Sequence, residues 1–261
     1  MANSIFAELQ MVSQLAKDNT VIDTRKQMNK IVEFFEARED YEECQRIFAE
    51  NVRNLKIETL KEAHGFMVQD DFNINDLPEE LQHDSLGFCS GIDCIFLGRY
   101  VYPVFDVKND VMGWVGYDKF VDPKYLDSKN HGYKAKAYSC YGMEKLPEYY
   151  ASDDIVIFTE GIVCTLYLRQ ESVQALAMLG SQISPYVLEI IKRFGKRAIV
   201  FMDADEAGTR LRKRLHYIAP EVRCVQSRVA KDIDDSRQVD PQIIDEIKKL
   251  KNPFYKSKLL K

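Results

Sequence analysis

The chain has 261 residues, of which 46% are hydrophobic and 30% are charged, enough for one large or two modest domains with a filled core. No stretch approaches the roughly 18–20 apolar residues that a membrane-spanning helix needs. Residues 1–7 lack the basic start and apolar run of a secretory signal. We therefore expect an intracellular, cytoplasmic protein with no membrane partner.

The net charge of −5 is divided unevenly along the chain. Residues 1–86 hold 9 basic and 18 acidic side chains, whereas the remaining residues hold 27 and 23. The basic residues of the second part gather at 192–197 and 210–214, and every charged residue after Glu246 is basic. Such clusters can neutralise phosphates, although for residues 192–197 taken alone we favour an ordinary solvated helix face.

Residues 1–85 are expected to form an acidic, mainly helical region. Apolar side chains such as Ile31, Phe34 and Phe48 recur at helical spacing between Gln27 and Arg53. His64-Gly65 is a typical helix stop.

Residues 86–152 are expected to form a basic, mixed α+β subdomain. Short β-like runs at 100–105 and 111–116 flank Asn109-Asp110, which favours a turn. This pattern predicts a β-hairpin.

Residues 153–240 alternate regularly between strand and helix patterns. We expect strands at 155–159, 173–178, 198–202 and about 221–229, and helices at about 163–169, 185–194 and 206–216. Ser184-Pro185 and Gly195 are start and stop signals for the second helix. The alternation predicts an α/β fold whose mainly parallel sheet is flanked by helices. Pro241 is expected to begin a last helix in a basic C-terminal segment, residues 241–261.

Three acidic elements follow in order: Glu160-Gly161, Asp203-Ala204-Asp205 and Asp232-Ile233-Asp234. The first two come directly after expected buried strands. Loops at the carboxyl ends of parallel strands converge on one crevice, so these carboxylates should meet. Crowded carboxylates repel unless they hold a divalent cation, and hard oxygen ligands suit Mg²⁺ or Mn²⁺.

The four aspartates are the expected metal ligands, and Glu160 either binds metal or acts on the proton of a reacting hydroxyl. Asp205 taken alone would be expected only to cap the helix that starts at Glu206. Because the three acidic elements occur together, we favour the metal site.

The six cysteines contain no C-x-x-C pair, so no zinc site is expected. Cys89 and Cys94 could supply half of one, but no second half with suitable spacing follows.

The acidic elements, together with Leu179-Gly180-Ser181 and the Ala207-Gly208 pair, have the order and spacing of a TOPRIM domain, the fold shared by DnaG-type primases, topoisomerases and some nucleases. The preceding segment resembles the DnaG-type RNA polymerase core over about residues 86–240. Its "R-x-x-F-P-I-x-D" hairpin corresponds to residues 99–106, its "P-K-Y-L-N-S" to residues 123–128, and the lysine before its "L-Y-G" to Lys136.

This resemblance implies a DNA primase, an enzyme that makes short RNA primers on single-stranded DNA by two-metal nucleotidyl transfer from ribonucleoside triphosphates. It assigns Glu160, Asp203 and Asp205 to catalysis. Five basic residues would hold template or nucleotide: Arg99, Lys124, Lys134, Lys136 and Lys231.

The chain also departs from the family pattern. Cys164, Asp127 and Tyr117 stand where aspartate, asparagine and arginine are usual, and neither the zinc-binding module nor a phosphate loop is found. We therefore expect a helicase or zinc-bearing partner, in a phage or other mobile-element setting. A TOPRIM nuclease and a non-catalytic nucleic-acid-binding replication subunit remain the alternatives.

Overall fold

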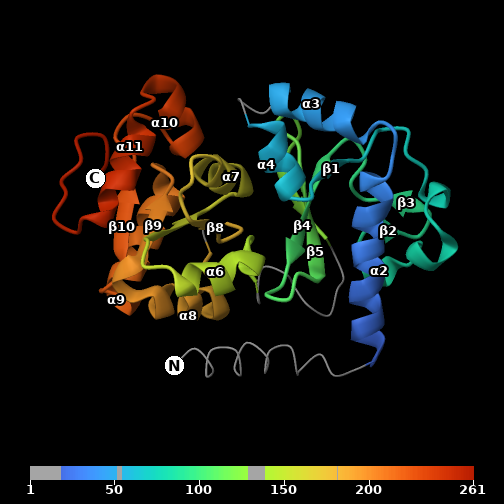
Figure 1. Ribbon diagram of the computed structural model, residues 1–261, viewed down its shortest axis with the longest axis horizontal. Helices are drawn as coiled ribbons and strands as arrows, with labels where there is room; N and C mark the ends of the chain where they lie inside the picture. The colour runs from blue at the N-terminus through green and yellow to red at the C-terminus, as the bar shows by residue number, and fades with distance from the viewer. Residues whose placement is uncertain (1–18, 52–54, 129–138, 181) are drawn as a thin grey trace. The chain divides into compact units, whose positions relative to one another are not determined.

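The computed structural model describes residues 19–51, 55–128, 139–180 and 182–261, with the backbone alone for 19–23, 234 and 237. The chain divides into two compact units (Figure 1). Unit 1 consists of residues 1–48 and 61–135, and unit 2 of residues 49–60 and 136–261. None of the described helices is both long and apolar enough to cross a membrane.

Unit 1 is built on an antiparallel sheet of four strands in the order β1-β4-β5-β6. Its centre is the predicted hairpin, with Asn109 in the left-handed region at the turn (φ 67°). Asp106 fixes this turn by accepting hydrogen bonds from the amides of Lys108 and Asp110. The strands are β1 (Phe66–Met67), β4 (Tyr100–Phe105), β5 (Val111–Tyr117) and β6 (Tyr125–Asp127).

The predicted helical stretch from Gln27 to Arg53 is two helices, because the chain turns between them. Arg38 donates two hydrogen bonds to the Asp40 carboxylate across this turn, at 2.9 and 3.0 Å. His64 adopts φ 53° two residues after the next helix, which confirms the predicted stop. The helices are α2 (Asn19–Glu36), α3 (Tyr41–Asn51) and α4 (Ile57–Glu62).

The core of unit 1 joins the acidic helices to the hairpin. Phe35 of α2 stacks on Phe66 with ring centroids 4.3 Å apart, and the fully buried Trp114 donates from Nε1 to the Leu86 carbonyl at 2.8 Å. The boundary that the sequence suggests near residue 86 therefore lies inside this unit. Its short elements are η1 (Ile74–Asp76), η2 (Glu79–Leu81), η3 (Asp84–Leu86), β2 (Cys89–Ser90) and β3 (Asp93–Cys94).

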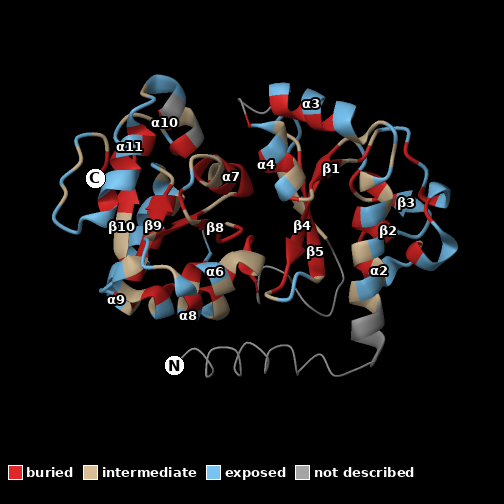
Figure 2. Ribbon diagram, in the orientation of Figure 1, coloured by how far each residue is buried: buried red, intermediate tan, exposed pale blue. Residues whose placement is uncertain are grey.

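Unit 2 contains a four-stranded, wholly parallel sheet in the order β10-β9-β7-β8. Its apolar strands are almost completely buried (Figure 2), as expected for a sheet covered on both faces. The predicted strands and the α/β class are confirmed. The strands are β7 (Val156–Thr159), β8 (Ala175–Ala177), β9 (Ala198–Met202) and β10 (Arg223–Gln226).

Helices cover both faces of this sheet. Right-handed crossovers put α8 and α9 on one face and α7 on the other, where α10 and α11 also pack. Ser184 caps α8 as predicted, accepting from the Val187 amide at 3.1 Å. The helices are α6 (Leu146–Ala151), α7 (Ile162–Gln170), α8 (Pro185–Phe194), α9 (Glu206–Ile218), α10 (Ile233–Val239) and α11 (Ile243–Lys248), with η4 (Met143–Lys145), η5 (Gly195–Arg197) and η6 (Lys249–Lys251).

The basic C-terminal segment packs into unit 2 rather than extending from it. Leu260 is 4% exposed within the core that α10 and α11 share with the sheet. The backbones of Gln226 and Lys261 exchange two hydrogen bonds of 2.9 Å beyond the edge strand β10. The last residues thus protect an otherwise open sheet edge.

Candidate metal and catalytic site

The first two acidic elements meet because their strands are neighbours. Glu160 follows β7 and Asp203 follows the adjacent parallel strand β9. The Asp203 amide donates to Oε1 of Glu160 at 3.1 Å. The two carboxylates therefore share one edge of the sheet, as the sequence predicts.

The third acidic element reaches the same edge through Lys231. The Ala204 amide donates to the Lys231 carbonyl at 2.6 Å. The Lys231 Nζ lies 3.3 Å from Oδ2 of Asp205 and 3.8 Å from Oδ2 of Asp203. Gln226, at the end of β10, also donates from Nε2 to the Asp203 carbonyl at 2.9 Å.

Two of the aspartates also cap helices. Asp205 accepts from the Gly208 amide at 2.9 Å at the start of α9, and Asp232 accepts from the Asp235 amide at 2.8 Å at the start of α10. Each uses Oδ1 for its cap, and Oδ2 of Asp205 is the atom that faces Lys231. Helix α10, which the sequence patterns did not predict, includes Asp234 in its first turn; the Asp234 side chain lies outside the described residues.

Gly208 allows α9 to begin directly against the loop that carries Asp203. A Cβ at this position would lie 2.1 Å from the Asp203 carbonyl oxygen and 3.2 Å from its nitrogen. Both neighbours are backbone atoms and cannot rotate away. The steric requirement at Gly208 is therefore set by the same loop that presents the carboxylates.

Burial and mutual repulsion raise the proton affinity of the inner carboxylates. Burial, followed by the charges of Glu160 and Asp232, raises the pKa of Asp203 to about 7. Burial also raises the pKa of Glu160. The Gly208 amide and then Lys231 lower the pKa of Asp205. Neighbouring carboxylates at this edge of the sheet therefore have pKa values shifted in opposite directions: up for Asp203 and Glu160, down for Asp205.

The donor chemistry fits a hard divalent cation. Among the described side chains, no three His, Cys, Asp or Glu residues already form a compact ligand group. The carboxylates of Glu160, Asp203 and Asp232 are nevertheless close enough to raise the pKa of Asp203. A cation at this edge would relieve that repulsion, and the available oxygens suit Mg²⁺ or Mn²⁺.

Sequence reasoning missed the residues that hold the Glu160 loop. The Thr159 hydroxyl lies 2.6 Å from that of Thr165 and donates to the Gly161 carbonyl at 2.9 Å. The Gly180 amide donates to the Glu160 carbonyl at 2.9 Å. Buried threonines at the end of an apolar strand and in the next helix are the sequence signal for this network.

In unit 1, Arg99 is hydrogen-bonded to the loop that contains Pro123 and Lys124. Its side chain is buried, and Nη1 donates to the Pro123 carbonyl at 3.1 Å. Arg99 therefore holds the loop that carries the exposed Lys124, whose Nζ lies 5.5 Å from the Tyr117 ring centroid. Lys134 and Lys136 lie outside the described residues.

The segment that carries the carboxylates matches a known family model. Residues 157–238, from β7 to α10, match the family model described as Toprim-like. This stretch of the chain is similar to Toprim-like domains. This stretch includes all five predicted carboxylates and Lys231.

Part of the chain is similar in sequence to bacterial DNA primases. The chain is 28% identical over 122 residues to the DNA primase of Aquifex aeolicus, covering 46% of this chain and 24% of that protein. It is 31% identical over 117 residues to the DNA primase of Clostridium acetobutylicum, covering 43% and 19%. The matched segment spans less than a quarter of either relative.

Solved structures extend the similarity in fold to most of the chain. The zinc-binding and RNA polymerase domains of the Aquifex aeolicus primase superpose with a TM-score of 0.72 and 20% identity, covering 92% of this chain and 62% of that one. The DnaG primase catalytic domain bound to single-stranded DNA gives 0.69 and 19%, covering 87% and 78%. The chain has the fold of the DnaG catalytic core.

Proposed function

We propose that this chain is the catalytic core of a DNA primase that extends short RNA primers on single-stranded DNA from ribonucleoside triphosphates. The observation that carries this proposal is the shared edge of Glu160, Asp203 and Asp205 at the ends of β7 and β9, with the pKa of Asp203 raised by burial and neighbouring carboxylates. Similarity to bacterial DNA primases supports the reaction class.

The reaction is an in-line attack of a 3′-hydroxyl on the α-phosphate of a nucleotide, with pyrophosphate as the leaving group. Asp203, Asp205, Asp232 and Asp234 are the residues that would hold Mg²⁺ or Mn²⁺, which would lower the pKa of the hydroxyl and neutralise charge on the phosphates. Glu160 has Oε1 fixed by the Asp203 amide, so Oε2 is available as a further ligand or to accept the hydroxyl proton.

Lys231 supplies the positive charge of the site. Hydrogen bonding to Asp205, followed by attraction to Asp203, raises the pKa of its ammonium group. Its side chain is 56% exposed, so the ammonium group can exchange carboxylate oxygens for phosphate oxygens of an incoming triphosphate. We assign Lys231, Lys124, Lys134 and Lys136 to nucleotide or template, and Arg99 to positioning Lys124.

We further propose that the protein acts inside the cell with a replication partner, either a helicase or a zinc-bearing protein. The acidic helices of unit 1 offer such a partner a surface: the first turn of α3 presents Glu42 and Glu43. A basic face on the partner would complement it.

The deciding experiment incubates the full chain with single-stranded DNA, labelled ribonucleotides and Mg²⁺ or Mn²⁺. We expect labelled oligoribonucleotides, which Asp203→Asn combined with Asp205→Asn abolishes. Glu206→Gln is the matched control, since this adjacent carboxylate is 87% exposed and pairs only with surface Arg210 among the described residues. Nicked DNA without RNA products would instead support a nuclease. A double variant that still supports replication in vivo would support a non-catalytic subunit.

A further inference from the structure

The outer side of α9 carries a dense row of basic residues. Residues 207–220 contain no acidic side chain but include Arg210, Arg212, Lys213, Arg214 and His216. All five are exposed. Glu206 pairs with Arg210 at the start of the helix; within the described part of the chain, no carboxylate is ion-paired with Arg212, Lys213 or Arg214.

Several cations in the other basic clusters of unit 2 have a specific partner. Lys192 of α8 pairs with Glu189 at 3.6 Å, and Lys249 pairs with Glu246 at 3.1 Å. Lys251 pairs with Asp154, and Arg197 donates to backbone carbonyls. On α9, by contrast, three consecutive exposed cations, Arg212, Lys213 and Arg214, have no ion-paired carboxylate among the described residues.

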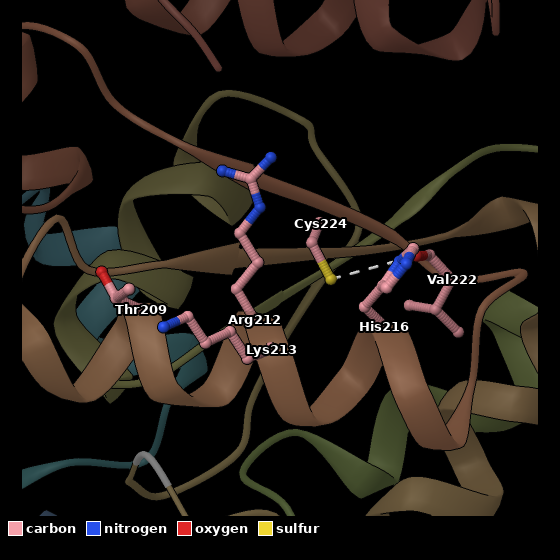
Figure 3. Close-up of a pocket in the computed structure, with 6 residues that line it drawn as sticks. All are labelled: Thr209, Arg212, Lys213, His216, Val222 and Cys224. Atoms are coloured by element: carbon pink, nitrogen blue, oxygen red, sulfur yellow. Dashed lines mark hydrogen bonds between the residues drawn. The ribbon is translucent and has the colours of Figure 1, made fainter.

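A pocket of about 500 Å³ lies beside this row (Figure 3). Thr209, Arg212, Lys213 and His216 line it from α9, and Val222 and Cys224 close it from the segment leading into and along β10. The four α9 residues are three or four positions apart, which puts them on one helical face. Arg212 rises into the pocket between Thr209 and His216 in Figure 3. Such a row offers hydrogen-bond donors to several anionic groups in succession.

An exposed aromatic ring lies next in the chain. Tyr217 is 87% exposed and stands four positions after Lys213, so the two side chains are neighbours on the helix surface. An aromatic ring beside cations is suited to stacking a nucleic-acid base while the cations hold its phosphates. A free phosphate has no base to stack on the ring, so the combination of cations and an aromatic ring favours a nucleic-acid strand as the ligand.

The pocket is connected to the candidate catalytic edge by α9 itself. Asp205 caps this helix, and the Thr209 hydroxyl donates to the Asp205 carbonyl at 2.8 Å. A nucleic-acid strand bound along α9 would therefore lead toward the carboxylates of Asp203 and Asp205.

We infer that the α9 pocket binds consecutive phosphates of a single-stranded nucleic acid, with a base on Tyr217. The inference rests on the proposed function, because a polymerase must hold the strand that it copies or extends. Its test measures binding, which does not require synthesis.

The test uses fluorescence anisotropy with the full chain and a labelled oligothymidylate of about 16 nucleotides, within the range of known strand-binding sites. Arg212→Ala combined with Lys213→Ala should weaken binding about tenfold and reduce the slope of log affinity against log salt by about 1.4, or 0.7 for each lost phosphate contact. Tyr217→Ala should weaken binding by roughly fivefold or more.

Two controls separate the site from general charge and from misfolding. Lys248→Ala combined with Lys251→Ala removes the same charge from the opposite face of the sheet, and should change affinity by less than about twofold, as expected beyond a screening length. Arg212→Lys combined with Lys213→Arg keeps both charges and should bind like the wild type. Equal losses in both alanine pairs, or an unchanged salt slope, would overturn the inference.

Calorimetry with a ribonucleoside triphosphate, in the Asp203→Asn, Asp205→Asn background, distinguishes the source of the phosphates. If Arg212 and Lys213 matter for the triphosphate but not for the oligonucleotide, the pocket binds nucleotides and the strand assignment fails. If the wild type makes no RNA yet binds DNA through α9, the proposed function fails and this inference stands.

Discussion

Asp203 shows at the scale of one residue how a group of crowded carboxylates opposes stability. Its side chain is only 22% exposed, and it has carboxylate neighbours in Glu160 and Asp232 that raise its pKa to about 7. A group whose folded pKa exceeds its unfolded value binds a proton more tightly in the native state. Stability is therefore lost as pH rises from about 4 toward 7.

Asp203→Asn should stabilise the metal-free protein while abolishing synthesis. We expect the variant to gain about 2 kcal/mol in the free energy of unfolding at pH 8, a figure below the full linkage value because the carboxylate is partly solvated. The gain should disappear near pH 3.5, where the wild-type carboxylate is protonated in both states. Urea unfolding across this pH range measures the gain, with Glu206→Gln, at an exposed carboxylate, as the matched control. A gain that stayed constant with pH would contradict the titration of Asp203.

Divalent cations should stabilise the wild type through the same carboxylates. At a hundredfold excess over its dissociation constant, Mg²⁺ or Mn²⁺ would add about 2.7 kcal/mol. The increase in melting temperature should be smaller at pH 5.5 than at pH 8, because protons compete for Asp203. Thermal unfolding with and without metal checks this, and Asp203→Asn combined with Asp205→Asn should show little increase. An undiminished increase in that variant would place the metal elsewhere.

At the scale of elements, the site is a set of strand ends joined to helix starts. β9 ends at Met202, Asp203 and Asp205 follow, and α9 begins at Glu206. Gly208 lets the first turn of this helix lie on the Asp203 backbone. The geometry of the carboxylates is therefore inseparable from the packing of α9.

Gly208→Ala should displace this loop. A Cβ at 2.1 Å from the Asp203 carbonyl oxygen cannot be accommodated without backbone movement, so we expect a loss of about 2–3 kcal/mol, typical of overpacking, and a large loss of synthesis. Denaturant unfolding and the primer assay measure the two effects. Ala207→Gly, which should cost only about 1 kcal/mol of helix propensity, is the matched control. Full activity in Gly208→Ala would show that the loop is not held by this contact.

At the scale of the whole molecule, segments far apart in the sequence complete each unit. Residues 49–60 join unit 2, where the Lys56 amide donates to Oε1 of Gln170 at 2.7 Å. The last residues protect the edge of β10, and Tyr255 and Ser257 donate to Glu246 at 2.5 and 2.6 Å. These bonds hold the pKa of Glu246 at about 2.

Deletion of residues 253–261 should open the edge of β10 and destabilise unit 2. The deletion removes the buried Leu260, whose loss alone is of the order of 2–5 kcal/mol, and the hydrogen bonds to Gln226 and Arg228. Hydrogen exchange should accelerate at the amides of these two residues while β4 and β5 of unit 1 stay protected. Phe254→Ala, at an 88% exposed position, should change neither. Unchanged exchange in the deletion would show that the tail does not protect this edge.

The sequence by itself determined the parallel sheet of unit 2, the hairpin of unit 1 and the order of the acidic elements. Strand–helix alternation and capping residues are local signals, and each of these features depends on residues close together in the chain. The TOPRIM resemblance likewise depends on short motifs. The pairing of Glu160 with Asp203 followed from one further rule, that parallel strands end at one edge.

Only the tertiary structure decided the remaining features, because they depend on contacts between distant residues. It buried the Arg99 side chain against the loop that contains Pro123, and it packed the last residues of the chain beside β10. It placed Lys231 beside Asp203 and Asp205 and made Asp232 the cap of α10. It also left Arg212, Lys213 and Arg214 of α9 without an ion-paired carboxylate among the described residues. The sequence shows where charged residues of one sign are concentrated, but only the folded structure determines which of them form ion pairs.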